Sequence, residues 1–136
     1  MGVVSLTIPL NVKTKSDATD VALIIMAAAG TSDVAVDPTA GKVTLNHEFP
    51  GDIDPLMQSL YERGLVNTAT VAVSVPVRPE AGAFVNGPEL VARLNAARAV
   101  SNASYDGKAV NATIAAATEA LDDLHERIVA AGLVLP

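Results

Sequence analysis

The chain contains no cysteine and no tryptophan among its 136 residues. The absence of cysteine excludes disulfide bonds, thiolate catalysis and thiolate-bound zinc, copper or iron–sulfur sites. Only 3% of the residues are aromatic although 50% are hydrophobic, so we expect a core of small and branched aliphatic side chains. Acidic residues outnumber basic ones, 15 to 9. This balance repels phosphate backbones and anionic lipid surfaces, and nucleic acid is therefore not an expected partner.

Long apolar runs and catalytic motifs are also absent. No stretch reaches the ~18 uninterrupted apolar residues that a membrane span needs, and the first residues lack the pattern of a secretory signal. We therefore expect a cytoplasmic protein without membrane insertion. The sequence has no glycine-rich phosphate loop, no Gly-x-Ser-x-Gly elbow and no metalloprotease spacing. From these patterns we expect neither enzymatic activity nor a cofactor.

The first half of the chain alternates between strand and helix patterns. Apolar and polar residues alternate from Val4 to Val12, which predicts a half-buried strand, although Pro9 within it would remove a ladder hydrogen bond from a central strand. An apolar segment over 18–29 predicts a helix, and further apolar patterns predict the elements that follow it. These are a hairpin over 34–49, a second helix from Asp54-Pro55 to Gly64, and a last strand over 71–77.

This order of elements predicts an α+β fold. The sequence β-α-β-β-α-β is typical of the ferredoxin-like split unit, in which two helices cover one face of a four-stranded antiparallel sheet. Met26 and Met57 fall within the apolar stripes of the two helices, so both are expected in the core.

The sequence pattern of the second half differs from that of the first and indicates helices. We predict a ferredoxin-like domain over residues 1–78, a linker over 79–87 and a two-helix hairpin over 88–136. No internal sequence repeat is evident. Apolar residues at alternating spacings of four and three predict a heptad seam on the last helix, formed by Val110, Ile114, Leu121, Leu124 and Ile128. The seam favours a homodimer, although packing against Leu90 and Leu94 within the chain would use the same surface.

One segment of the first half resembles a known family. Residues Gly30–Leu45 read GTSDVAVDPTAGKVTL, which is similar to the "G-V-x-x-V-x-V-D … G-K-V-T-V" hairpin of heavy-metal-associated domains. The resemblance covers about residues 4–77 and continues through the second helix, where the family's landmarks fall on Asp52, Leu56, Leu60 and Gly64. It implies the ferredoxin-like fold and a functional loop after the first strand.

That loop lacks the family's metal ligands. In copper chaperones of the family it holds two cysteines, whose places correspond here to Thr14 and Asp17. A hydroxyl and a carboxylate do not replace two thiolates for soft copper, so copper transfer is excluded. The resemblance implies instead that the substituted loop contacts a protein partner through Lys13, Thr14, Lys15, Ser16 and Asp17. The same residues also fit the ordinary start of a helix, since serine and aspartate cap helix N-termini.

Two histidines raise a second functional hypothesis. A divalent metal such as zinc or nickel is the alternative ligand, with His47, Asp122, His125 and Glu126 as its candidate ligands. A partly buried strand-end histidine and a solvated acidic helix face would explain the same residues. A small-molecule-sensing regulatory domain is the third alternative. The leading prediction is a non-enzymatic binding or interaction protein with a protein partner.

Overall fold

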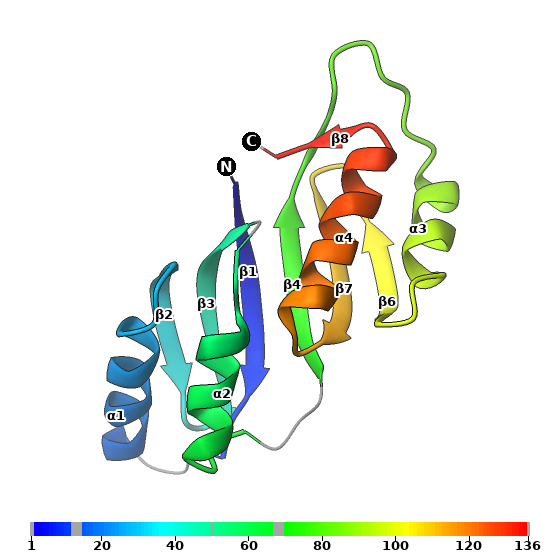
Figure 1. Ribbon diagram of the computed structural model, residues 1–136. Coiled ribbons are helices and arrows are strands. Elements are labelled where there is room, and N and C mark those ends of the chain that lie inside the picture. The colour runs from blue at the N-terminus through cyan, green and yellow to red at the C-terminus, as the bar shows by residue number, and fades with distance from the viewer. Residues whose placement is uncertain (1, 12–14, 50, 67–69, 136) are drawn as a thin grey trace.

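The structure is a computed structural model that describes residues 2–11, 15–49, 51–66 and 70–135 (Figure 1). Its helices in these ranges are α1 (Lys15–Met26), α2 (Asp54–Glu62), α3 (Gly87–Asn95) and α4 (Thr118–Ala130). Its longer strands are β1 (Gly2–Pro9), β2 (Thr31–Asp37), β3 (Lys42–Phe49), β4 (Thr70–Pro76), β6 (Val100–Tyr105) and β7 (Ala109–Ala115). Two short strands, β5 (Arg78–Pro79) and β8 (Leu133–Val134), complete the list.

Six strands form one antiparallel sheet in the order β2-β3-β1-β4-β7-β6. The helices lie on one face of this sheet, with α2 and α4 over its middle and α1 and α3 toward its two edges (Figure 1). The first half therefore has the predicted α+β, ferredoxin-like arrangement, because its chain order β1-α1-β2-β3-α2-β4 folds into the strand order β2-β3-β1-β4. Among the described residues, no helix is long and apolar enough to cross a membrane.

The core lies between the sheet and its helices. Alternation along each strand sends aliphatic side chains to the helix-covered face, as with Leu6, Leu45 and Val73, each at most 3% exposed. The opposite face carries small or polar side chains that are exposed or half-buried, including Ser5, Thr44, Ala72, Ser74, Asn111 and Thr113. The low aromatic content agrees with this core, in which Phe49 is the one buried phenylalanine, since Phe84 is exposed.

The prediction of a two-helix hairpin over 88–136 is wrong. Helices α3 and α4 exist, but the hairpin β6–β7 separates them and joins the sheet beside β4. The register between β4 and β7 runs over seven residue pairs, from Thr70↔Ala115 to Pro76↔Ala109. The second half of the chain therefore extends the sheet of the first half.

The second half also repeats the architecture of the first. Strand β7 pairs with β4 as β3 pairs with β1, so Val73↔Ala112 corresponds to Leu6↔Leu45. Helices α3 and α4 then take the places of α1 and α2. The two strands that open the units end alike, because β1 finishes Ser-Leu-Thr-Ile-Pro and β4 finishes Ala-Val-Ser-Val-Pro. An internal structural repeat is therefore present, although no internal sequence repeat was evident.

Local backbone features confirm this repeat. Both edge strands contain a non-glycine residue with positive φ, Asp33 in β2 (51°) and Asn102 in β6 (53°), each at a break in the register with the next strand. Both hairpin turns depend on an aspartate whose Oδ1 accepts two backbone N–H groups, Asp37 in the first unit and Asp106 in the second.

The two units share β4, which is the last strand of the first unit and the first strand of the second. Strand β1 covers the edge of β4 that the last strand of the second unit would otherwise occupy. Within the described residues, that last strand, β8, consequently pairs with β5 alone, the continuation of β4. Gly2 and Leu135 meet at this junction, where a Cβ on Gly2 would lie 2.8 Å from the Leu135 side chain.

Pro9 is accommodated without a bulge. It ends β1, and the pairing between β1 and β4 stops at Thr7, so no β4 carbonyl requires an N–H from residue 9. Leu10 then donates its N–H to the Gly41 carbonyl at 2.7 Å. In the second unit Val77 follows Pro76 and donates to the Lys108 carbonyl at 2.9 Å, so proline closes the opening strand of both units in the same way.

Candidate interaction surfaces

The predicted partner-contact loop is only partly described. Lys13 and Thr14 lie outside the described residues, and Lys15 and Ser16 begin α1 without described side chains. Asp17 is exposed in the first turn of α1. The helix therefore begins at Lys15, ahead of the apolar segment 18–29 from which it was predicted, and the partner role of the loop stays a prediction.

A groove lies between α2 and α1, which is the helix that follows this loop. Its volume is about 550 Å³. The lining residues are mostly apolar: Leu23, Ile24, Ala27, Ala28, Ala29, Pro55, Ser59 and Arg63. Ala27, Ala28 and Ala29, which follow the end of α1, contribute only small side chains to this lining.

Two large apolar side chains of α1 face solvent near this groove. Leu23 is 61% exposed and Met26 is 62% exposed, whereas Val21 and Ile25 are buried against the sheet. The expectation that Met26 lies in the core is wrong, while Met57 of α2 is buried as expected. Helix α1 therefore has apolar residues on both faces, one of which packs on the sheet and the other of which remains uncovered.

A further exposed apolar side chain lies in the range predicted as a linker. Phe84 is 89% exposed and belongs to the loop between β5 and α3. By the internal repeat, this loop occupies in the second unit the place of the loop after β1. Phe84 is not among the residues predicted from the sequence, although an isolated aromatic residue in a chain with two phenylalanines is a usable signal.

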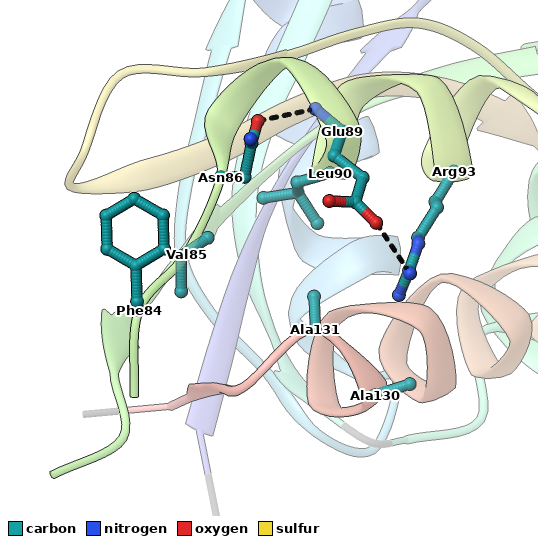
Figure 2. A pocket seen from close by; sticks show the side chains of 8 residues that line it. All are labelled: Phe84, Val85, Asn86, Glu89, Leu90, Arg93, Ala130 and Ala131. Carbon is teal, nitrogen blue, oxygen red and sulfur yellow. Dashed lines mark hydrogen bonds and ion pairs between the residues drawn. The ribbon is translucent and has the colours of Figure 1, made fainter. Parts of the chain in front are cut away.

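Phe84 borders a cavity of about 310 Å³ at the end of α4 (Figure 2). The apolar residues Val85, Leu90, Ala130 and Ala131 line it together with the polar residues Asn86, Glu89 and Arg93. Glu89 and Arg93 form an ion pair of 2.7 Å on its rim, and Asn86 caps α3 by accepting the Glu89 N–H at 3.0 Å. Figure 2 places Phe84 at one end of this group and Arg93 at the other.

The predicted oligomer seam is wrong. Val110 and Ile114 belong to β7, and Leu121, Leu124 and Ile128 belong to α4. All five side chains are fully buried and form part of the core between the sheet and α4. They are not available to a second subunit.

The candidate metal ligands are not brought together. His47 is buried, and its Nδ1–H donates to the Glu48 carbonyl oxygen at 2.9 Å. The ring of His125 packs edge-on against Phe49 with centroids 4.9 Å apart, whereas Asp122 and Glu126 line an acidic groove on α4. Within the described residues, no group of three or more histidine or carboxylate side chains has metal-binding geometry.

His47 has an unusual environment for a polar side chain. Its Nε2 is buried and has no hydrogen-bond partner among the described residues. Gly30 is close, since a Cβ there would lie 3.4 Å from Nε2. The corresponding position of the second unit is Ile114, because Val100↔Ile114 matches Thr31↔His47.

A polar junction connects the starts of α2 and α4. Thr118 Oγ1 accepts the N–H groups of Ile53 (2.9 Å) and Asp54 (3.1 Å) and donates to Asp52 Oδ1 at 2.6 Å. Asp54 Oδ1 in turn accepts the Thr118 N–H at 2.8 Å. The hydrogen bond from Thr118, followed by one from the Asp54 N–H, lowers the pKa of Asp52 below 3.8. Each helix start is therefore capped by a residue of the other unit.

No protein-family model matches this chain, and no curated protein matches it. Among solved structures, it is similar to the solution structure of the N-terminal soluble domains of Bacillus subtilis CopA. The sequence identity is 15%, the TM-score is 0.40, and the match covers 95% of this chain and 89% of that chain.

Proposed function

We propose that the protein is a non-enzymatic interaction module, built on heavy-metal-associated-like ferredoxin units without thiolate ligands, that binds a partner protein through α1. The observation that carries this proposal is the exposure of Leu23 and Met26 beside an open apolar groove. Large apolar side chains next to a concave apolar surface are typical of protein interfaces.

The groove favours a particular kind of partner. It runs between two helices and has an apolar lining, which suits the apolar face of an amphipathic segment. Arg63 is the one charged residue of its lining, so a carboxylate on the partner has a cation to pair with. We extend the proposal to the segment at the start of α1, whose basic residues Lys13 and Lys15 are the sequence's candidates for partner contact.

The test compares partner capture by the wild-type chain with capture by the double variant Leu23→Asp/Met26→Asp. Burying a leucine or methionine side chain stabilises a complex by about 1.5–3 kcal/mol, so introducing charge at both sites should weaken binding by more than ~100-fold. Crosslinked partners would be identified by mass spectrometry. The matched control is Val129→Asp, which places the same charge on the exposed face of α4.

The expected result is loss of the wild-type partner set with the double variant and its retention with the control. Circular dichroism should give both variants the wild-type melting temperature within a few degrees, because all three side chains are more than half exposed. An unchanged partner set in the double variant would exclude the α1 surface as the binding site.

A further inference from the structure

A groove lies between the first half of α4 and the turn that follows α3. This α4 groove has a volume of about 900 Å³, and its lining surface is mostly apolar. Ala99 and Ala120 are among the small side chains that line it. Three carboxylates of α4 border it: Glu119, Asp122 and Glu126. The α4 groove is therefore an apolar concave surface with charged groups along one wall.

These three carboxylates are not neutralised within the protein. Among the described residues, they have no recorded ion pair or hydrogen bond. A fourth carboxylate of the lining, Asp123, is paired with Arg127 at 3.2 Å. A fifth, Asp54, accepts the Thr118 N–H. Arg98 is the one cation in the described lining, so the α4 groove keeps an excess of negative charge.

The first unit has a corresponding helix without this excess. Helices α2 and α4 occupy equivalent places, and counting from their first residues aligns Asp122 with Gln58. The same count aligns Glu126 with Glu62. In α2, Gln58 Nε2 donates to Glu62 Oε1 at 3.0 Å. In α4, the two positions hold like charges four residues apart, which lowers helix stability. The second unit therefore keeps a charge that its fold does not need, and this indicates a role in binding.

From these observations we propose that the α4 groove binds a basic amphipathic helix of a partner protein. Glu119, Asp122 and Glu126 are three and four residues apart, so they form a row along α4 at intervals of about 4.5–6 Å. Basic residues at the same spacing on a partner helix face all three, while its apolar residues cover the alanines of the lining. Side chains on one face of an extended strand lie about 6.4–6.8 Å apart and fall out of register with this row.

The occupant of the α4 groove differs from a second copy of this chain. To match the row, a helix needs basic residues three or four positions apart, and no two of the nine lysines and arginines in the sequence have that spacing. The α4 groove belongs to the second unit. The proposal therefore does not depend on the partner-binding role of α1, and each can fail without the other.

The first test measures binding of a synthetic peptide to the full chain by isothermal titration calorimetry at about 0.15 M salt. The peptide has about 18 residues of leucine, alanine and lysine, with lysines at intervals of three and four beside a stripe of leucines. A second peptide has the same composition in scrambled order. The wild-type chain should bind the patterned peptide more tightly. No binding at about 1 mM, or equal binding of both peptides, overturns the proposal.

The same titration is repeated with a variant that neutralises the row, Glu119→Gln/Asp122→Asn/Glu126→Gln. Each exposed ion pair contributes up to about a fivefold change in affinity, so losing three should raise the Kd about tenfold. The matched control neutralises three exposed carboxylates outside the groove: Asp20→Asn, Glu62→Gln and Glu80→Gln. It makes the same change in net charge and should leave the Kd within about twofold. An equal loss of affinity in both variants overturns the proposal, because general acidity would then explain the binding.

The second test separates a binding role from a structural one. Asp122→Gln copies Gln58 of the first unit and removes the like charge beside Glu126. It should raise the melting temperature by about 1–2 °C and weaken binding of the patterned peptide by about twofold or more. A lower melting temperature would show that Asp122 supports the fold, and unchanged binding would exclude it from the contact. Either result overturns the proposal.

Discussion

Replacing Thr118 by valine tests the junction between the two units. Valine keeps the shape of threonine but removes Oγ1, and with it the acceptor for the N–H groups of Ile53 and Asp54. The Asp54 N–H retains Asp52 Oδ1 at 3.0 Å, so the main loss falls on Ile53, which is fully buried. Loss of a helix cap costs ~0.5–2 kcal/mol, and leaving a buried donor unsatisfied costs ~1–3 kcal/mol. Both costs arise largely from the same hydrogen bond, that of the Ile53 N–H, so they are not added. We therefore expect a loss of about 2 kcal/mol.

The assay is thermal unfolding followed by circular dichroism. For a chain of this length, 1 kcal/mol corresponds to roughly 4 °C, so the melting temperature should fall by about 8 °C. The control is Thr113→Val on the open face of the sheet, because within the described residues the Thr113 hydroxyl has no recorded hydrogen bond. If Thr118→Val and Thr113→Val shift the melting temperature equally, the junction contributes nothing to stability and the reasoning fails.

Three further predictions concern pH, the buried histidine and the loop before α1. The pKa of Asp52 is lower in the folded state than its ordinary value of 3.8, so the stability that Asp52 contributes is fully present above pH 3.8 and is lost as the pH falls through the folded-state pKa. Urea unfolding at a series of pH values should show this loss of stability in the wild type and a smaller loss in Thr118→Val, which lacks the hydrogen bond from the Thr118 hydroxyl. His47→Ile, which copies the second unit, should raise the melting temperature by about 4 °C in thermal unfolding, since it removes a buried nitrogen without a partner; a decrease would show that the imidazole supports the fold. Lys13→Glu/Lys15→Glu should abolish partner capture in crosslinking assays, and undiminished capture would exclude the loop.

The first unit could be predicted from the sequence because each of its elements has a local signal. Strand β1 alternates strictly, and the turn at Asp37 contains the aspartate, proline and glycine typical of hairpins. The second unit has the hairpin signal Asp106-Gly107, but strand β6 before it, Val-Ser-Asn-Ala-Ser-Tyr, does not alternate strictly. Its hairpin turn is shorter, with Gly107-Lys108 between Asp106 and Ala109, and this length difference obscured the repeat.

The error in the second unit has a geometric cause. Val110 and Ile114 are four residues apart, a spacing that places two side chains on one face of a helix and equally on one face of a strand. The end of β7 and the segment before α4 contain Ala112, Ala115, Ala116 and Ala117, and alanine is compatible with both a helix and a strand. The sequence pattern of β7 and α4 together therefore resembles one continuous helical stripe. Only the pairing of β7 with β4 decides between them, and this pairing is a long-range contact that a local pattern does not contain.

Exposure at the two interaction surfaces was beyond sequence reasoning for a related reason. Met26 lies in an unbroken apolar run and Met57 is followed by Gln58 and Ser59, yet Met57 is buried and Met26 is 62% exposed. The difference arises because α2 lies over the middle of the sheet, whereas α1 stands at the edge strand β2 with no further element beyond it among the described residues. A helix at the edge of a one-sided sheet has an outer face that its own unit does not cover. Apolar residues on that face therefore add little to folding, and their exposure supports the proposed partner-binding surface.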